Sequence, residues 1–286
     1  MSGVAISLVL LSALLHAVWN FFSKGSNDRW AFFFGQGIAT LVVYTPFVIW
    51  QWPRTGIDGL GWLYVAGSAV THAGYAFYLL KAYDAGDLSV AYPLSRTAPV
   101  LVALWDVATL HNQLTPAGFC GVMLAGVGAL TLQLPAVRAH GPRAVLRQRV
   151  TRYALVTAVF IAAFTIFDKQ GVGHVPPFIF LYLISFGEFT LIGLRLGRGA
   201  LPRVAGELRA NPAQLLFTGI AGPFSYLLIL WVLTTAPASY VLGLRQTSIV
   251  FGVLLGHFFL GERETRYRLA GALIVAAGSA LIAAAG

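Results

Sequence analysis

Ten apolar stretches separated by short polar breaks make up most of this 286-residue chain. A helix needs roughly 20 apolar residues to cross the hydrocarbon core of a bilayer, and each stretch is close to that length. Because a helix satisfies its own backbone hydrogen bonds, it is also an element that lipid tolerates. The pattern predicts an all-α integral membrane protein with ten transmembrane helices, at residues 3–23, 30–50, 60–83, 88–110, 116–134, 152–169, 176–194, 212–234, 238–260 and 268–285.

Charged residues are too few to cover the surface of a soluble protein. They make up 10% of the chain, and hydrophobic residues make up 58%, whereas soluble domains carry about a quarter charged residues. The net charge of +9 does not indicate a nucleic-acid partner, because most Lys and Arg lie in the polar breaks, where they act as topology signals. We therefore expect membrane lipids as the surroundings and no nucleic acid.

Enzyme motifs are missing from the sequence. It contains no HExxH, no GxSxG, no Walker loop and no CxxC. We expect no catalytic residue, no metal and no cofactor, and any work done by the protein must come from gradients and not from ATP. Two other functions stay open at this point: a flippase for a lipid-linked intermediate, and an intramembrane enzyme that uses His16, His72 and a carboxylate.

The two halves of the chain resemble each other. Residues 12–24 read SALLHAVWNFFSK and align with residues 157–169, TAVFIAAFTIFDK. Five helices in each half is an odd number, so the second half must enter the membrane from the opposite face, as in many secondary transporters. The alternative is a chance likeness between Ala/Leu/Gly-rich helices. The sequence predicts two inverted five-helix repeats, residues 1–134 and 152–286, joined by a basic linker at 135–151.

Glycines support the same alignment. Gly121 and Gly128 in the fifth predicted helix match Gly271 and Gly278 in the tenth at a constant spacing. Small residues at such positions let helix backbones approach closely in a membrane. We interpret them as packing positions without chemistry.

Positive charges predict the orientation. Numbered in chain order, the odd polar breaks hold fifteen Lys and Arg, and the even breaks hold only Arg54 and Lys169. The positive-inside rule then places the odd breaks in the cytoplasm and both termini outside. Lys24 and Lys169 end equivalent helices, where each is expected to anchor at the interface or to pair with Asp28 or Asp168.

Four segments carry a family resemblance: HAVWNFFSK at 16–24, YLLKAYDAGDLSVAYPLSR at 78–96, APASYVLGLRQTS at 236–248 and LGERET at 260–265. With them, essentially the whole chain resembles EamA-type transporters of the drug/metabolite transporter superfamily. The resemblance implies ten helices around a central cavity between two halves. It also implies transport of small metabolites, often amino acids or related compounds and here in the export direction, across the bacterial inner membrane.

The chain departs from the family pattern at two places. His111-Asn112 replaces the usual Gly-Glu pair in the first half, while the second half keeps Gly261-Glu262. Gln246 follows Arg245, where related sequences often carry Glu, so coupling to a proton or another ion is left open. Members of the family are usually described with cytoplasmic termini, and here we follow the opposite charge count.

Polar and aromatic residues form a stripe on the first predicted helix. His16, Trp19 and Asn20 are three or four residues apart, so they share one face of an otherwise apolar helix. His72 and Tyr75 repeat the pattern on the third helix. Such side chains stack on planar solutes and also hydrogen-bond, which favours a cavity wall. The alternative for each histidine is an interhelical hydrogen bond.

Two arginines lie at equivalent positions of the two halves, each a few residues after a tyrosine. The guanidinium groups of Arg96 and Arg245 stay charged and bind carboxylate or phosphate in two places. One or both are candidates to bind an anionic group of the solute. The alternatives are an internal ion pair with Glu188 or Asp106, or a side chain that extends to the interface.

The complete set of candidates for the wall of a solute cavity is His16, Trp19, Asn20, His72, Tyr75, Tyr78, Tyr92, Arg96, Phe164, Glu188, Tyr226, Tyr240 and Arg245. The expected partner is a small anionic or zwitterionic molecule. The sequence does not determine the oligomeric state, and a monomer is compatible with it.

Overall fold

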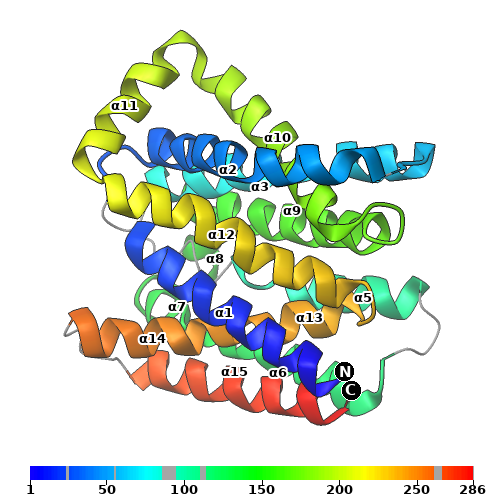
Figure 1. Ribbon diagram of the computed structural model, residues 1–286. Coiled ribbons are helices and arrows are strands. Elements are labelled where there is room, and N and C mark those ends of the chain that lie inside the picture. The colour runs from blue at the N-terminus through cyan, green and yellow to red at the C-terminus, as the bar shows by residue number, and fades with distance from the viewer. Residues whose placement is uncertain (24–25, 55, 86–94, 110–113, 261–265, 286) are drawn as a thin grey trace.

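The computed structural model describes residues 1–23, 26–54, 56–85, 95–109, 114–260 and 266–285 (Figure 1). Within these ranges every regular element is helical, which confirms the all-α class. The elements are α1 (Gly3–Ser23), α2 (Arg29–Gln51), η1 (Trp52–Arg54), α3 (Gly59–Ala85), α5 (Ala98–Thr109), α6 (Pro116–Thr131), α7 (Leu134–His140), α8 (Pro142–Arg147), α9 (Arg149–Gly171), α10 (Pro177–Leu196), η2 (Gly197–Gly199), α11 (Ala200–Ala210), α12 (Pro212–Leu233), α13 (Ala238–Arg245), α14 (Thr247–Leu260) and α15 (Arg266–Ala285).

Seven helical segments of the described chain are long and apolar enough to cross a membrane, fewer than the ten predicted. They are Gly3–Asn20, Arg29–Gln51, Arg149–Gly171, Pro177–Ala210, Pro212–Leu233, Ala238–Gly256 and Arg266–Ala285. The other three predicted spans fall short for different reasons. The helix α3 has 27 residues but several polar ones, α6 has 16 residues, and α5 has 12 because part of the predicted span 88–110 lies outside the described residues.

Helix boundaries follow local signals in the sequence. Asp28 caps α2 by accepting a hydrogen bond from the Ala31 amide, and Thr115 caps α6 by accepting one from the Gly118 amide. Side chains of this kind satisfy amide groups that have no partner inside the helix. Pro116, Pro142 and Pro177 open their helices, at positions where a missing N–H group costs nothing.

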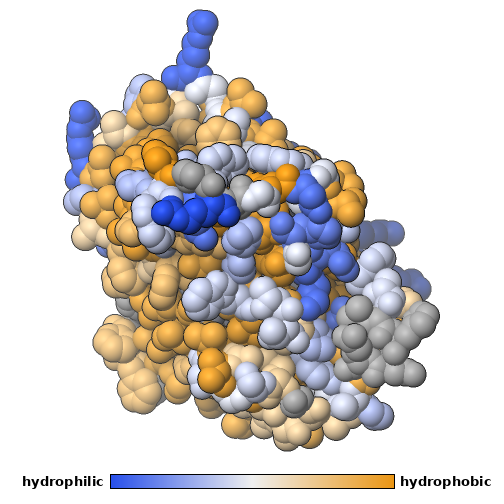
Figure 2. Space-filling model, turned by 45° about the vertical axis from the view of Figure 1, so that its right-hand side comes forward, coloured by the Kyte–Doolittle hydropathy of each residue, from blue (hydrophilic) through white to orange (hydrophobic). Residues whose placement is uncertain are grey.

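The outer surface is rich in large hydrophobic side chains. Phe47, Trp50, Trp231, Phe258 and Leu273 are each more than half exposed. Figure 2 shows hydrophobic residues over most of the face turned to the viewer. A surface of this kind is suited to contact with lipid tails and not with water.

The helices pack as antiparallel pairs between the two halves of the chain. α1 packs along α12, where Ser12 and Ser225 bond reciprocally: each hydroxyl donates to the other residue's carbonyl, over 2.7 and 2.9 Å. α3 packs along α9, where Gly67 lies against Phe167 and Gly74 against Phe160. Small residues in both pairs let one helix surface enter the other.

α6 and α15 approach each other closely through their backbones. A Cβ atom added at Gly121 would lie 2.8 Å from the Gly278 carbonyl oxygen, and one added at Gly128 would lie 2.8 Å from that of Gly271. The sequence alignment pairs Gly121 with Gly271 and Gly128 with Gly278. When each glycine is replaced by the one aligned with it, the contact between Gly121 and Gly278 becomes the contact between Gly271 and Gly128. A two-fold relation between the halves would produce this exchange.

The molecule has two chemically different ends. At the terminal end the two termini lie close together (Figure 1), and the apolar core is concentrated there, with Val9, Val65, Ile179, Leu230 and Val241 fully or almost fully buried. At the opposite end, which we call the basic end, lie the starts of α2 and α9, the end of α3, and α11, with their Arg and Lys side chains.

Ion pairs hold the helices together at the basic end. Arg203 of α11 donates to the Asp28 carboxylate over 2.7 and 3.0 Å, and Glu207 accepts a hydrogen bond from the Asp28 amide. The Arg203 hydrogen bonds hold the pKa of the Asp28 carboxyl below its ordinary value. Lys81 lies over the rings of Phe77 and Tyr153, 4.5 and 5.7 Å from their centroids.

We expect the variant Gly121→Ala to be less stable than the wild type by about 1–3 kcal/mol, because its methyl group overpacks against backbone that has no room to move. Gly252→Ala is the matched control, since nothing lies within 4 Å of a Cβ atom at that position. The Tm of each variant in detergent measures the effect. A Gly121→Ala protein that melts at or above the wild-type temperature would contradict the close contact.

Candidate functional site

A cavity lies in the middle of the bundle, between the two halves of the chain. The space available to the centres of water molecules is about 170 Å³, more than ten times what one water needs. It is lined by residues of α1, α2, α3, α5, α9, α10, α12 and α13, together with Ser95, Arg96 and Gln246. Ten of the predicted residues line it: His16, Trp19, Asn20, His72, Tyr75, Arg96, Phe164, Glu188, Tyr226 and Arg245.

Two of the other predicted residues lie elsewhere, and Tyr92 is outside the described residues. Tyr78 stacks on Phe160, with ring centroids 5.6 Å apart. Tyr240 is buried, and its hydroxyl accepts a hydrogen bond from the Thr115 amide over 2.9 Å. Helical phase explains both positions, since at 100° per residue Tyr78 is turned by roughly 120° from His72, and Tyr240 by roughly 140° from Arg245.

One side of the cavity carries a cationic group, the His16–Arg96 pair. Arg96 Nη2 donates to His16 Nε2 over 2.6 Å. Since a guanidinium only donates, this ring nitrogen accepts, and the proton of the neutral ring is on Nδ1. Trp19 stacks on His16 with ring centroids 5.5 Å apart, and Gln246 donates to the Arg96 carbonyl over 2.6 Å. The positive charge is thus held in a defined place.

Arg245 lies between this side and the other. It is the last residue of α13 and only 9% exposed, and its guanidinium carbon lies 5.2 Å from the centroid of the Tyr226 ring. The helical segment Ala238–Gly256 continues past it with a local irregularity at Gln246, whose amide donates to the Gly243 carbonyl over 3.2 Å. A cation at a helix C-terminus is favoured by the helix dipole.

The opposite side of the cavity is acidic, with Glu188 in the cavity wall and Asp168 behind it. Asp168 has no exposed surface and accepts hydrogen bonds from the hydroxyls of Ser68 and Tyr226. Its Oδ2 atom also lies 3.2 Å from His72 Nε2. His72 in turn stacks on Phe164, with ring centroids 3.9 Å apart. The carboxylate of Asp168 therefore links α3, α9 and α12.

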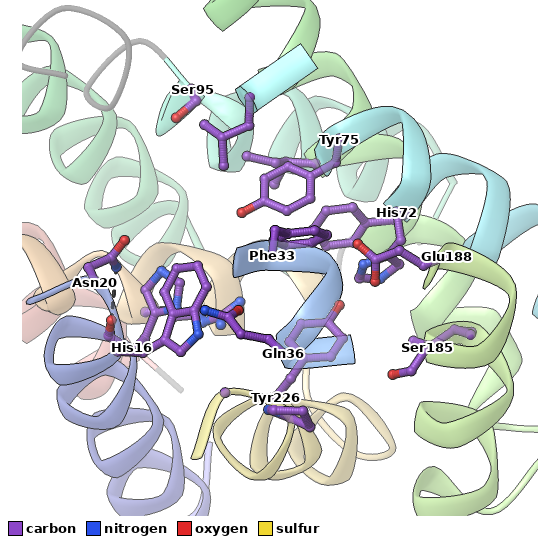
Figure 3. A pocket seen from close by; sticks show the side chains of 18 of the residues that line it. His16, Asn20, Phe33, Gln36, His72, Tyr75, Ser95, Ser185, Glu188 and Tyr226 are labelled. Carbon is purple, nitrogen blue, oxygen red and sulfur yellow. Dashed lines mark hydrogen bonds between the residues drawn. The ribbon is translucent and has the colours of Figure 1, made fainter. Parts of the chain in front are cut away.

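Glu188 of α10 also belongs to the acidic side. It is 8% exposed and lines the cavity, and its carboxylate has no hydrogen bond to any described residue. In Figure 3, His16 and Asn20 lie at one side of the cavity and His72 and Glu188 at the other, with Gln36 and Tyr226 between them.

Metal binding finds no support in the described ranges, where no three His, Cys, Asp or Glu side chains come together as metal ligands. The cavity therefore offers charges, hydrogen-bonding groups and aromatic rings as its means of binding.

Comparison with known proteins identifies the family. Residues 3–133 and 151–284 each match the EamA-like transporter family, and together they cover almost the whole chain. The chain belongs to the EamA-like transporter family. It is a multi-pass membrane protein of a transporter family, and not of an enzyme family.

One curated relative agrees with this, and one solved structure shares the fold. The EamA-like chain is 21% identical to an uncharacterized transporter of Helicobacter pylori, over 96% of this chain and 92% of the relative. It also resembles a protein of known crystal structure with a TM-score of 0.72 and 15% identity, over 98% of this chain and 96% of that one. The second likeness supports the fold alone.

Sequence reasoning missed part of the cavity wall of this EamA-like protein. Several polar or aromatic lining residues were not predicted, among them Phe33, Gln36, Thr40, Ser95, Ser185 and Gln246. The spacing of Gln36 and Thr40, and of Ser185 and Glu188, repeats the polar stripe seen on the first helix and was the available signal. Asp168 was considered only as a partner of Lys169, and its three actual partners come from other helices.

Lys169 and Asp106 take part in a different contact, at the terminal end. Lys169 Nζ donates to the carbonyls of Leu233 and Ala236, over 2.7 and 3.0 Å, at the end of α12. Asp106 accepts a hydrogen bond from the Ser239 amide over 2.8 Å, at the start of α13. A cation at a helix C-terminus and an anion at a helix N-terminus both suit the helix dipoles. The turn between α12 and α13 is thus held by α9 and α5.

We expect the variant Tyr226→Phe to be less stable by about 1–3 kcal/mol, because it removes one donor from a wholly buried carboxylate. Tyr64→Phe is the control, since the Tyr64 hydroxyl makes no hydrogen bond to a described residue. Thermal unfolding of both variants in detergent measures the difference. Equal Tm values for the two variants would show that the hydroxyl contributes nothing to holding Asp168.

Proposed function

We propose that this EamA-like protein is a secondary transporter that moves a small anionic or zwitterionic metabolite, such as an amino acid, by alternating access. One observation carries the proposal: a central cavity with a cationic side and an acidic side, enclosed by helices of both halves. Buried charges are costly in a membrane and mark solute or ion pathways.

The cationic side supports recognition of a carboxylate. Arg96 and Arg245 line the same cavity, and a guanidinium binds a carboxylate through two parallel hydrogen bonds. Aromatic rings of Trp19, Phe33 and Phe164 complete the wall and suit an apolar or planar part of the solute. An amino acid or a related metabolite combines both features.

Two inverted five-helix repeats with ten membrane crossings are part of the proposal. The exchange of glycine contacts between α6 and α15 supports a two-fold relation between the halves. So do the two antiparallel pairs α1–α12 and α3–α9, each of which joins one helix from each half. In transporters built this way, one half rocks against the other around a fixed central site.

The orientation follows from the basic end. We propose that this end faces the cytoplasm of a bacterium, with both termini on the outer side of the inner membrane. Asn20, Phe33 and Tyr83 of the cavity wall lie near the basic-end limits of their helices, while the terminal end is packed by the apolar core. This is a cavity loaded from the cytoplasm, which supports export.

We expect Arg96→Ala and Arg245→Ala each to weaken the binding of carboxylate solutes about 10- to 100-fold, because a charged hydrogen bond contributes roughly 1.5–3 kcal/mol. Binders are first identified by thermal shift with amino acids and organic acids, and counterflow in liposomes then measures their transport. Arg198→Ala, at an exposed position outside the cavity, is the control. If both cavity variants transport every solute as the wild type does, the arginines do not bind it.

Cysteine labelling tests the orientation. In a Cys120→Ser background, which removes the single native cysteine, we expect Ser2→Cys to react with an impermeant thiol reagent on intact cells. Ala144→Cys, exposed on α8 at the basic end, is expected to react only after the cells are permeabilised. The reverse labelling pattern would place the termini in the cytoplasm.

A further inference from the structure

Glu188 is an ionisable group of the cavity wall whose carboxylate no hydrogen bond to a described residue stabilises. It is 8% exposed, faces the cavity and has no hydrogen bond to any described residue. A carboxylate without a partner is costly at membrane depth, and such groups persist where they serve a function. The two ways to remove the cost are to take up a proton or to pair with a cation.

The groups around Glu188 leave proton uptake and pairing with a cation as the two ways to remove this cost. The ionisable groups around it are His72 and Tyr75 from α3, Asp168 from α9, Tyr226 from α12 and Arg245 from α13, while α2 contributes the neutral Gln36. Asp168 receives three hydrogen bonds, so its negative charge is stabilised and repels a second one nearby. His72 is already bonded to Asp168 and stacked on Phe164.

A solute cation fits the same place. The cationic His16–Arg96 pair and Glu188 lie on opposite sides of one cavity (Figure 3). A solute whose carboxylate is bound on the cationic side can therefore direct an ammonium group toward Glu188. A metal ion is not favoured, because Glu188 is not part of a three-ligand cluster in the described residues.

We propose that Glu188 holds an exchangeable proton, which the ammonium group of the bound solute displaces. The O–H bond of the carboxylic acid breaks, the proton passes to water in the cavity, and the carboxylate pairs with the ammonium, so charge is balanced before and after. This rests on the proposed transport function. When the solute leaves on the far side, a proton takes its place and returns with the carrier, so the transporter exchanges an amino acid for a proton.

Two consequences are measurable. Binding of the solute releases about one proton, and its affinity falls by up to tenfold for each pH unit below the point where Glu188 takes up that proton. A carboxylate solute without an ammonium group releases none, because it has nothing to displace the proton. Phenylalanine and 3-phenylpropionate differ in this one group and share the ring and the carboxylate.

The experiment is isothermal titration of the purified protein with L-phenylalanine and 3-phenylpropionate in buffers of different ionisation enthalpy, which counts the protons released. Wild type is expected to release about one proton per phenylalanine and none with 3-phenylpropionate. Glu188→Gln is expected to release none with either compound. Glu207→Gln changes a second buried carboxylate, one at the basic end and outside the cavity wall, and is expected to release protons as the wild type does.

Several results would overturn the inference while leaving the transport function intact: phenylalanine binding without proton release, unchanged release from Glu188→Gln, or binding of 3-phenylpropionate but not phenylalanine. If neither compound binds, solutes with a phenyl ring are excluded, and a solute-free measurement decides the inference. In the inference, Glu188 of the folded protein keeps its proton at a pH where the unfolded chain has already lost it. The wild-type Tm therefore falls as the pH rises from about 5 to about 8. Glu188→Gln should fall less steeply, whereas the exposed control Asp84→Asn should match the wild type; equal slopes for all three overturn the inference.

Discussion

Asp168 carries a carboxylate with no exposed surface, at a depth where an uncompensated charge is costly. Two hydroxyls and an imidazole compensate it, and they come from α3 and α12, while Asp168 itself belongs to α9. The same contacts position the cavity wall, because Tyr226 lies under the Arg245 guanidinium and His72 stacks on Phe164. The buried charge therefore links the packing of three helices to the arrangement of the groups that face the cavity.

Close packing has a complementary role away from the cavity. The reciprocal serine contact of α1 and α12 and the glycine contacts of α6 and α15 let backbones approach where lipid supplies no hydrophobic force between helices. The apolar core packs the terminal end, next to the Lys169 and Asp106 contacts with the α12–α13 turn. The central space is left to the polar and aromatic residues, which extend toward the basic end.

Much of the helical layout could be predicted from the chain, since a run of apolar residues of membrane length forms a helix when it crosses a bilayer. The stripe of His16, Trp19 and Asn20 was also readable, because residues three and four apart share a helix face. Tyr78 and Tyr240 were predicted wrongly although the same helical phase excludes them, since each lies more than 100° around its helix from the residue that lines the cavity. The partners of Asp168 come from α3 and α12, 58 to 100 residues away in sequence, and helical periodicity carries no information on such contacts.

The proposed alternating access requires that some of these contacts break while others persist. Those near Asp168 lie between helices that all line the cavity, so they can move with the site as one unit. The contacts of Lys169 and Asp106 are different, because they join α9 and α5 to the turn that precedes Arg245 at the packed end. Opening that end would separate a cation and an anion from the helix termini that stabilise them. In the proposed mechanism, opening this end therefore has to disrupt the contacts of the α12–α13 turn, and a solute bound by Arg245 would act on the helix directly attached to that turn.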